Sequence, residues 1–179
     1  DPKDAKQEFV NWRNGLEGYP IQTCNKARHL SMDARGRIWI ATTAGALRMD
    51  MVDGDPSKAT FEHYYCDTKE KHSLSANDVH WIEHTPQGET YMATFGGGLN
   101  LMLPEGEQKG KVTFEQIGRE EGVASDILLA ICPDRWGNLW MATENGISQL
   151  NIPMRSIRNF NRLAPRLRMT EAAIAHDNH

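Results

Sequence analysis

The stretch DRWGNLWMATENG, residues 134–146, occurs twice more in the chain in altered form. Residues 33–45 are DARGRIWIATTAG, and residues 85–97 are TPQGETYMATFGG. The three copies share the pattern G-x-x-[WY]-[IM]-A-T-x-x-G, and their first glycines, at 36, 88 and 137, lie 52 and 49 residues apart. A fixed period of this length is typical of a repeat architecture. The repeat therefore decides the fold class before any single strand is considered.

Each copy lies among segments with the two-residue periodicity of β-strands. An inner strand is expected before the first glycine turn, at 27–32, 79–84 and 127–132. A second strand is expected directly after that turn, at 37–42, 89–94 and 138–143. A third is expected after the second glycine turn, at 46–51, 98–103 and 147–152. Outer strands are expected at the F-x-x-aromatic or similar pairs Phe9/Trp12, Phe61/Tyr64, Phe114/Ile117 and Ile157/Phe160.

Four short antiparallel strands in each unit of about 50 residues are the signature of a β-propeller blade. The sequence therefore predicts an all-β fold, a β-propeller fragment that occupies residues 1–179. About three complete four-stranded blades are expected, at 27–65, 79–117 and 127–160, with partial blades at 1–26 and 161–179. A helical solenoid is excluded because the repeated segments lack a 3.6-residue period and are bounded by Gly, Pro, Asp and Asn.

The repeated residues themselves have an expected structural role. The ring residues recur at one blade position, so we expect them to pack between neighbouring blades. The threonines are expected to bond locally at the second turn, and the glycines to supply the turns. The structural set is Gly36, Trp39, Thr42, Gly45, Gly88, Tyr91, Thr94, Gly97, Gly137, Trp140, Thr143 and Gly146.

Composition excludes several classes of protein. The chain is 39% hydrophobic and 25% charged, and 20 basic against 24 acidic residues give a formal charge of −4. This balance does not indicate a nucleic-acid partner. No apolar run approaches the roughly 18 residues of a membrane-spanning helix, so no direct membrane insertion of this segment is expected. The start, Asp1-Pro2-Lys3-Asp4, lacks an initiator Met and a signal-peptide apolar region, which suggests an excised piece.

No metal, cofactor or catalytic set is predicted. Cys24, Cys66 and Cys132 are odd in number and have no zinc-ligand spacing, and Cys132 is expected to be a small buried residue; their redox state is left open. His80 and His84 are four residues apart, but on a strand that spacing separates them by roughly 13 Å, too far for one ion. No Ser/His/Asp or Cys/His arrangement is marked by its context, so the segment is predicted not to be an enzyme.

The G-x-x-W-[IM]-A-T-x-x-G-[AIG] pattern, preceded by LSANDV at 74–79 and VASDI at 123–127, resembles the two-component regulator propeller repeat. The third copy, PDRWGNLWMATENGI at 133–147, is the best match. Ala stands for the usual Gly before Thr at 41, 93 and 142, and Tyr91 stands for Trp. The resemblance extends from about Phe9 to the last residue.

Such repeats occur in the periplasmic sensor regions of hybrid two-component system histidine kinases. The resemblance implies an extracytoplasmic, periplasmic ligand-sensing segment whose receptor binds a carbohydrate and signals to a histidine kinase. In that family the sensor region is usually a dimer. The implied partners are therefore a small-molecule or oligosaccharide ligand, the remaining propeller blades, the downstream signalling domains and a second copy of the chain.

Candidate ligand-binding residues follow from position on the ring. Polar and aromatic residues that do not recur, but occupy recurring positions on one face, are not explained by the scaffold. An aromatic ring with planar polar groups suits sugar recognition. The candidates are Arg28, Asn77, Asp78, His80, Trp81, Phe95, Asp126, Glu144 and Asn145. Two alternatives stay open: a propeller enzyme of lyase or lactonase type, with a metal or catalytic histidine at the channel mouth, and a protein-interaction propeller.

Overall fold

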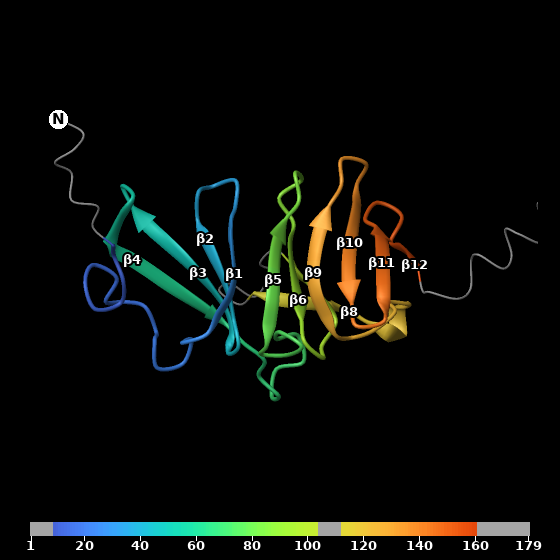
Figure 1. Cartoon of the computed structure of the whole chain (residues 1–179), viewed down its shortest axis with the longest axis horizontal. Coiled ribbons are helices and arrows are strands. Elements are labelled where there is room, and N and C mark those ends of the chain that lie inside the picture. Colours follow the sequence, from blue (N-terminus) through green and yellow to red (C-terminus); the bar gives the residue numbers. More distant parts are fainter. Residues whose placement is uncertain (1–8, 104–111, 161–179) are drawn as a thin grey trace, which may run out of the picture.

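The computed structural model describes residues 9–103 and 112–160, which form three four-stranded antiparallel sheets (Figure 1). Blade 1 consists of β1 (Ala27–Met32), β2 (Ile38–Thr42), β3 (Gly45–Val52) and β4 (Asp55–Tyr64). Blade 2 consists of β5 (Val79–His84), β6 (Thr90–Thr94), β7 (Leu99–Leu103) and β8 (Thr113–Ile117). Blade 3 consists of β9 (Leu128–Pro133), β10 (Asn138–Thr143), β11 (Gly146–Asn151) and β12 (Ser156–Phe160). A short 3-10 helix, η1 (Arg119–Glu121), lies between blades 2 and 3.

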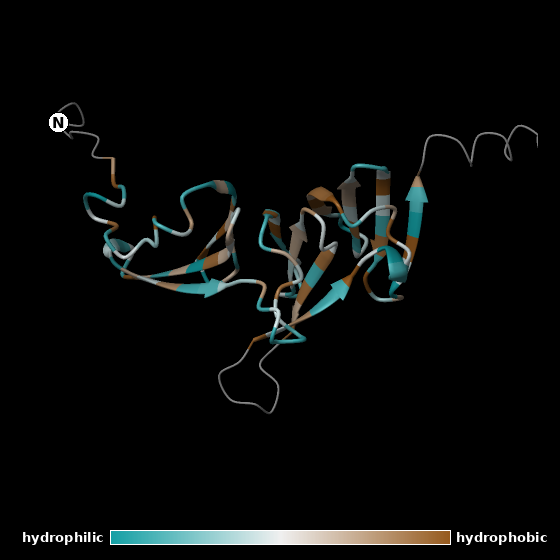
Figure 2. Cartoon of the chain, turned by 90° about the horizontal axis from the view of Figure 1, so that it is seen from below, coloured by the Kyte–Doolittle hydropathy of each residue, from teal (hydrophilic) through white to brown (hydrophobic). Residues whose placement is uncertain are grey.

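The three sheets lie side by side in chain order, and each is a meander whose spatial order follows the sequence (Figure 1). The inner strand β5 packs against β1 on one side and β9 on the other. The outer strands β4 and β12 carry mostly hydrophilic residues, as the strand leading into the grey C-terminal trace shows in Figure 2. This arrangement of blades confirms the predicted all-β propeller fragment.

The described part of the predicted first partial blade differs from the expectation. Phe9 and Trp12 are exposed and lie in no strand, because between residues 9 and 26 the only β-pairing is isolated bridges at Asn11. This segment instead covers one face of blade 1, where Cys24 is buried beside Leu47 and Tyr19 packs edge-on against Phe61. The prediction for residues 161–179 falls outside the described residues.

Large side chains fill the spaces between the blades. Trp39 is 1% exposed and belongs to a core that includes Val79, Ile82 and Met92 of blade 2. Tyr91 is also 1% exposed, and its core includes Leu128 of blade 3. The ring residues of blades 1 and 2 therefore join each blade to the next.

The face of blade 3 that carries Trp140 corresponds to the faces of blades 1 and 2 that carry Trp39 and Tyr91, but no described residues form a blade against it. The strand register places Ile147 where Ala46 and Leu99 lie in blades 1 and 2. Ala46 and Leu99 are 0% exposed, whereas Ile147 is 46% exposed. Cys132 pairs with Trp140 on this face and is exposed, so the expectation that Cys132 is buried is wrong. Burial at this position depends on an adjacent blade.

The first turn of blades 1 and 3 is built around an aspartate. Asp33 Oδ2 accepts a hydrogen bond from Trp39 Nε1 at 2.9 Å, and Asp134 Oδ2 accepts one from Trp140 Nε1 at 2.9 Å. Blade 2 has Thr85 and Tyr91 at these two positions. The absence of aspartate at position 85 agrees with the absence of tryptophan at position 91, because tyrosine has no indole N–H to donate to a turn carboxylate.

Acid is expected to weaken the Asp33 turn. Burial acts to raise the pKa of Asp33, but hydrogen bonds from Trp39 and Arg37 outweigh it and lower the pKa to about 2. Because this lies below the unfolded value of about 4, the stabilisation by ionised Asp33 is complete above about pH 4 and is lost as the pH falls through 2. Urea unfolding of the wild type and D33N is therefore expected to give curves that converge on acidification. A difference that stays constant from neutral pH down to about pH 2 would contradict this account.

The second turn places one glycine differently from the sequence prediction. The hydroxyls of Thr42 and Thr94 donate to Gly45 O and Gly98 O, each at 2.8 Å. Gly98, rather than the predicted Gly97, is therefore the counterpart of Gly45, and the blade 2 turn contains one extra residue. The order Thr94-Phe95-Gly96-Gly97-Gly98 conceals this insertion, because three successive glycines fit more than one register.

Candidate functional site

The candidate residues lie on the face of the blades where the inner strands begin and the second turns return, which we call the entry face. Two of the candidates perform the same scaffold role in successive blades. Asn77 Oδ1 accepts from Cys66 N, and Asp126 Oδ1 accepts from Arg119 N, each at 2.8 Å. The two side chains hold equivalent loops, so the structure explains them without a ligand.

The backbone of these residues also connects neighbouring blades. Gly45 N donates to Asn77 O at 2.6 Å, and Gly98 N donates to Asp126 O at 2.8 Å. Each second turn is thus bonded to the segment that leads into the next inner strand. The equivalent backbone bond at both junctions fixes the distance between neighbouring blades at the entry face.

Glu144 and Asn145 lie in the second turn of blade 3. Glu144 Oε1 accepts from Ser125 Oγ at 3.0 Å, and Asn145 Nδ2 donates to Ala124 O at 3.3 Å. Within residues 9–103 and 112–160, no hydrogen bond joins either side chain to the other candidates. The structure therefore does not bring these two residues into the cluster formed by blades 1 and 2.

Four candidates do come together, and we call Arg28, Asp78, His80 and Phe95 the entry cluster. Arg28 binds Asp78 through two parallel hydrogen bonds, Nε to Oδ1 at 3.0 Å and Nη2 to Oδ2 at 2.9 Å. Arg28 and His80 both lie at β-bulges, where the register of β1 against β2 and of β5 against β6 shifts. The bulges place these two side chains at the start of their strands on the entry face.

His80 lies between a carboxylate and an aromatic ring. Its Nε2 is 3.6 Å from Asp78 Oδ2 and is buried without a hydrogen-bond partner in the described structure. Its ring stacks on Phe95 with centroids 5.3 Å apart and an interplanar angle of 24°. An unpartnered buried nitrogen is uncommon in proteins, and it singles out His80 within the cluster.

Phe95 directly follows Thr94, as Thr43 follows Thr42 and Glu144 follows Thr143, so the extra residue of the blade 2 turn comes after Phe95. Its N–H donates to Asp78 O at 2.8 Å, and it forms an isolated bridge with Ile127 at the start of blade 3. The backbone is therefore held from both sides while the side chain stays 47% exposed. The number of residues between the Thr and the following apolar strand is the sequence signal that distinguishes this turn from the other two.

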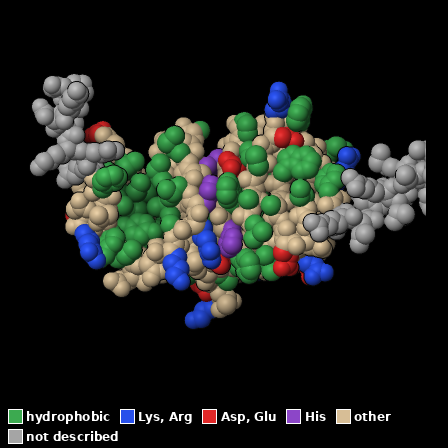
Figure 3. Space-filling model, viewed as in Figure 1, with side chains coloured by type: hydrophobic (Ala, Val, Ile, Leu, Met, Phe, Trp, Pro, Cys, Tyr) green, Lys and Arg blue, Asp and Glu red, His purple; other side chains and the backbone are tan. Residues whose placement is uncertain are grey.

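Trp81 lies next to the entry cluster but is partly covered. His29 stacks on its indole with centroids 3.8 Å apart, and Trp81 Nε1 donates to Glu83 Oε2 at 3.3 Å. Histidine side chains form a column over β1 and β5 on the face shown in Figure 3. Burial lowers the pKa of His29, although the negative charge of Glu83 acts to raise it. Because the His29 ring covers one side of the Trp81 indole, a ligand could contact that indole only from the other side.

The entry cluster combines an ion pair, a histidine and an exposed aromatic ring. Among the described residues, no group of three or more His, Cys, Asp and Glu side chains could hold a metal ion. Cys24 Sγ lies 3.6 Å from His63 Nε2, but Cys24 is buried and burial raises the pKa of its thiol, which disfavours the reactive thiolate. The entry cluster offers an exposed ring and a planar ion pair instead.

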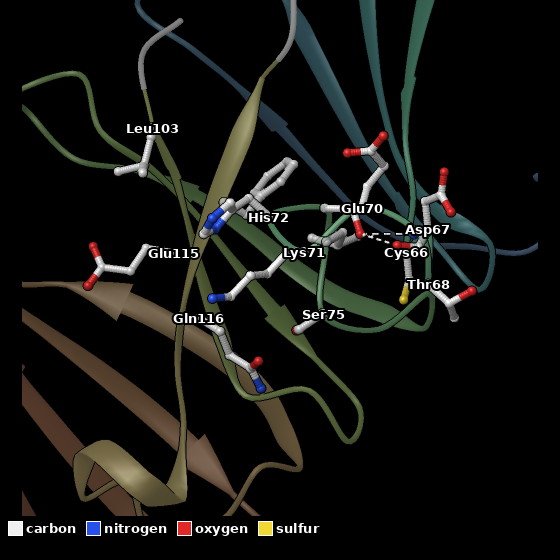
Figure 4. A pocket seen from close by; sticks show the side chains of 13 residues that line it. Cys66, Asp67, Thr68, Glu70, Lys71, His72, Ser75, Leu103, Glu115 and Gln116 are labelled. Atoms are coloured by element: carbon white, nitrogen blue, oxygen red, sulfur yellow. Dashed lines mark hydrogen bonds between the residues drawn. The ribbon is translucent and has the colours of Figure 1, made fainter. Parts of the chain in front are cut away.

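A cleft that the sequence did not indicate lies between the loop at residues 66–75 and β8. It has a volume of about 530 Å³ and is lined by Asp67, Lys71 and His72 of the loop and by Glu115 and Gln116 of β8 (Figure 4). Figure 4 shows the Lys71 side chain directed toward β8. Phe114 N donates to His72 O at 2.8 Å, which fixes the loop against the strand. The segment between β4 and β5, which contains this loop, is longer than the segment between β8 and β9, so comparison of the repeats could not find the cleft.

Residues 122–145 match the two component regulator propeller family. The chain is 22% identical over 152 residues to histidine kinase P4 of Formosa agariphila, a match that covers 84% of this chain and 10% of that protein.

Two solved structures share the fold. One is the extracellular domain of a putative one component system from B. thetaiotaomicron, with a TM-score of 0.68, 23% identity, and coverage of 89% of this chain and 22% of that chain. The other is the extracellular domain of a putative hybrid two component system from the same organism, with a TM-score of 0.61, 26% identity, and coverage of 78% and 18%.

These findings confirm the resemblance drawn from the repeat. The chain contains a two-component regulator propeller repeat, resembles extracellular domains of such regulators and has a distant histidine kinase relative. It spans 10% of the length of the kinase and 22% or less of the two solved chains. In the described residues, no helix is both long and apolar enough to cross a bilayer.

Proposed function

We propose that this chain is a ligand-sensing propeller segment of a periplasmic, extracytoplasmic receptor that signals to a histidine kinase, and that it performs no catalysis of its own. The ligand is a carbohydrate bound at the entry face. The observation that carries the proposal is the entry cluster, because its residues differ from those at the same positions of the other blades. Blades 1 and 3 have Lys26 and Ile127 where blade 2 has Asp78.

A sugar fits the chemistry of the cluster. The exposed Phe95 ring supplies an apolar surface for the C–H face of a pyranose, and the Arg28–Asp78 pair supplies planar donors and acceptors for hydroxyls. The ion pair is internally neutral, so the pair itself favours a ligand without a strong net charge. Both partners are part-exposed, with side chains 40% and 31% accessible, so hydroxyls can reach them.

The placement of the cluster supports a role in signalling. Arg28 belongs to blade 1, Asp78 and His80 to blade 2, and Phe95 bridges to Ile127 of blade 3. A ligand bound here would act on two blade junctions at once. In the proposed receptor, a further blade covers the open face of blade 3. Downstream signalling domains respond to the conformational change that ligand binding causes. The receptor is a homodimer.

Removing the exposed ring is the direct test of the ligand site. F95A is expected to weaken carbohydrate binding by about three- to tenfold, the effect of losing one aromatic contact. A panel of oligosaccharides is screened by thermal shift, and affinity for any stabilising sugar is then measured with wild type and variant. W136A is the matched control, because Trp136 is 71% exposed and lies in the first turn of blade 3, at the other ends of the strands. Equal weakening by F95A and W136A, or no effect of F95A on a sugar that binds, would contradict the assignment.

A further inference from the structure

Three arginines line a cleft at the opposite ends of the strands, on the face formed by the first turns, which we call the hairpin face. Arg35, Arg37 and Arg48 of blade 1 face Gln87 and Glu89 of blade 2 across a cleft of about 620 Å³. Apolar residues, among them Leu101 and Met102, also line the cleft. Of the described residues that line the cleft, three carry a positive charge and Glu89 alone carries a negative one.

The repeat does not require these arginines. The first turns place Arg35 where blades 2 and 3 have Gln87 and Trp136. Arg37 corresponds in the same way to Glu89 and Asn138. Because Arg48 pairs with Trp39 across β2 and β3, the equivalent pairings give its counterparts as Leu101 and Gln149. Two neutral or acidic alternatives at each position build the same blade, so the scaffold does not explain why three arginines gather at this cleft.

Carboxylates outside the cleft lining hold two of the arginines in place. Arg37 Nε donates to Asp33 Oδ2 at 2.6 Å. Arg48 Nε donates to Asp50 Oδ2 at 2.8 Å, and its Nη2 lies 2.7 Å from Glu62 Oε2. Asp33, Asp50 and Glu62 are absent from the residues that line the cleft. These bonds orient the two guanidinium groups, and because Arg48 Nη1 also donates to Tyr64 Oη at 3.0 Å, each nitrogen of the Arg48 guanidinium already has a partner.

Free donors remain on two of the lining arginines, Arg35 and Arg37. In the described part of the chain, no acceptor is bonded to Nη1 or Nη2 of Arg37 or to the side chain of Arg35. The Arg37 guanidinium also lies over the Trp39 ring, 5.7 Å from its centroid, which limits its movement. Guanidinium groups that are already oriented lose less freedom when they bind an oxyanion.

We propose that this cleft binds an oxyanion, namely the sulfate, phosphate or carboxylate group of a small ligand. A volume of about 620 Å³ lies within the range of small-molecule sites and accepts a monosaccharide. Gln87 and Thr90 supply neutral polar contacts for the rest of the ligand. The site is distinct from the entry cluster, because Arg28 lies at the beginning of β1 and Arg35 follows its end.

The test is a titration of the chain with a sulfated glucose, a phosphorylated glucose and glucuronate, with glucose as the neutral control. Binding is followed by backbone amide chemical shifts in NMR spectra at constant ionic strength. At least one anion is expected to bind more tightly than glucose and to shift amides of the Asp33–Arg37 turn. R35A is expected to weaken this binding by about tenfold, the effect of losing one charge-assisted contact. In the described structure the Arg35 side chain makes no hydrogen bond or ion pair, and the hydrogen bond from its backbone N–H to Asp33 Oδ1 is kept in R35A, so this variant is expected to fold.

R135A is the matched control, since Arg135 is an exposed arginine in the first turn of blade 3 and stacks on Trp136. R135A is expected to bind the anion like wild type. Equal weakening by R35A and R135A, binding of glucose as tight as that of the anions, or no anion-dependent shift at millimolar concentrations would overturn the proposal. The three anions distinguish which oxyanion the cleft prefers. F95A is expected to leave anion binding unchanged, so failure of this site and failure of the entry-face site are separable results.

Discussion

Replacing Trp39 by alanine is expected to lower the free energy of unfolding by about 3–5 kcal/mol. Trp39 is 1% exposed and lies in the core shared by blades 1 and 2. The variant loses the buried indole, leaves a cavity between the sheets and removes the hydrogen bond to Asp33. Urea unfolding followed by circular dichroism measures the loss, provided that wild type and variant have equal denaturant slopes.

W140A provides an internal control for this prediction. Trp140 occupies the same position in blade 3 and donates the same 2.9 Å hydrogen bond, to Asp134. It is only half-buried and stacks on Phe160 at the open face of the blade. Its removal is expected to cost clearly less than removal of Trp39. Equal losses would show that packing between blades is not the source of the stabilisation.

Replacing Gly45 by alanine is expected to cost at least about 3 kcal/mol, from left-handed strain together with steric overlap. The residue has φ of +109°, and a Cβ at this position would lie 2.2 Å from Tyr64 O. The clashing atom is a backbone carbonyl of the paired outer strand, so a rotamer change cannot relieve the overlap. Thermal unfolding and the yield of folded protein both report this effect.

G36A separates the two contributions. Gly36 also has a positive φ, of +76°, but a Cβ there would meet no heavy atom within 4 Å. Only the backbone strain of about 1–2 kcal/mol is expected. If G45A were no more costly than G36A, the close approach of Tyr64 O could not be the reason for glycine in this turn.

The sequence predicted most of the fold because the repeat appears three times. The inner strands at 27–32 and 79–84 agree with the structure at both ends. The prediction for Phe9 and Trp12 was wrong because an F-x-x-aromatic pair alone carries no strand periodicity. Gly97 was assigned in place of Gly98 because a glycine run conceals a one-residue insertion. Cys132 was misjudged because burial of a blade face depends on the neighbouring blade.

The candidate site was predictable only in part. Comparing blades identified Arg28, Asp78, His80 and Phe95, which the structure brings together. The same comparison could not reveal that Asn77 and Asp126 bond to loop backbone, because their function depends on partners that are not adjacent in sequence. The arginine cleft was missed because Arg48 contributes to it from the third strand, and the sequence does not show which side chains will lie together at the cleft.

The backbone bonds from Gly45 to Asn77 and from Gly98 to Asp126 have a mechanical consequence. Blades 1 and 2 are each bonded through the returning turn to the blade that follows, so the three described blades are connected in series. A displacement of blade 1 along the entry face would pull directly on the start of β5, and through the blade 2 turn on the start of β9. A displacement is therefore expected to pass through the three described blades in sequence order, by way of the Gly45 and Gly98 turns.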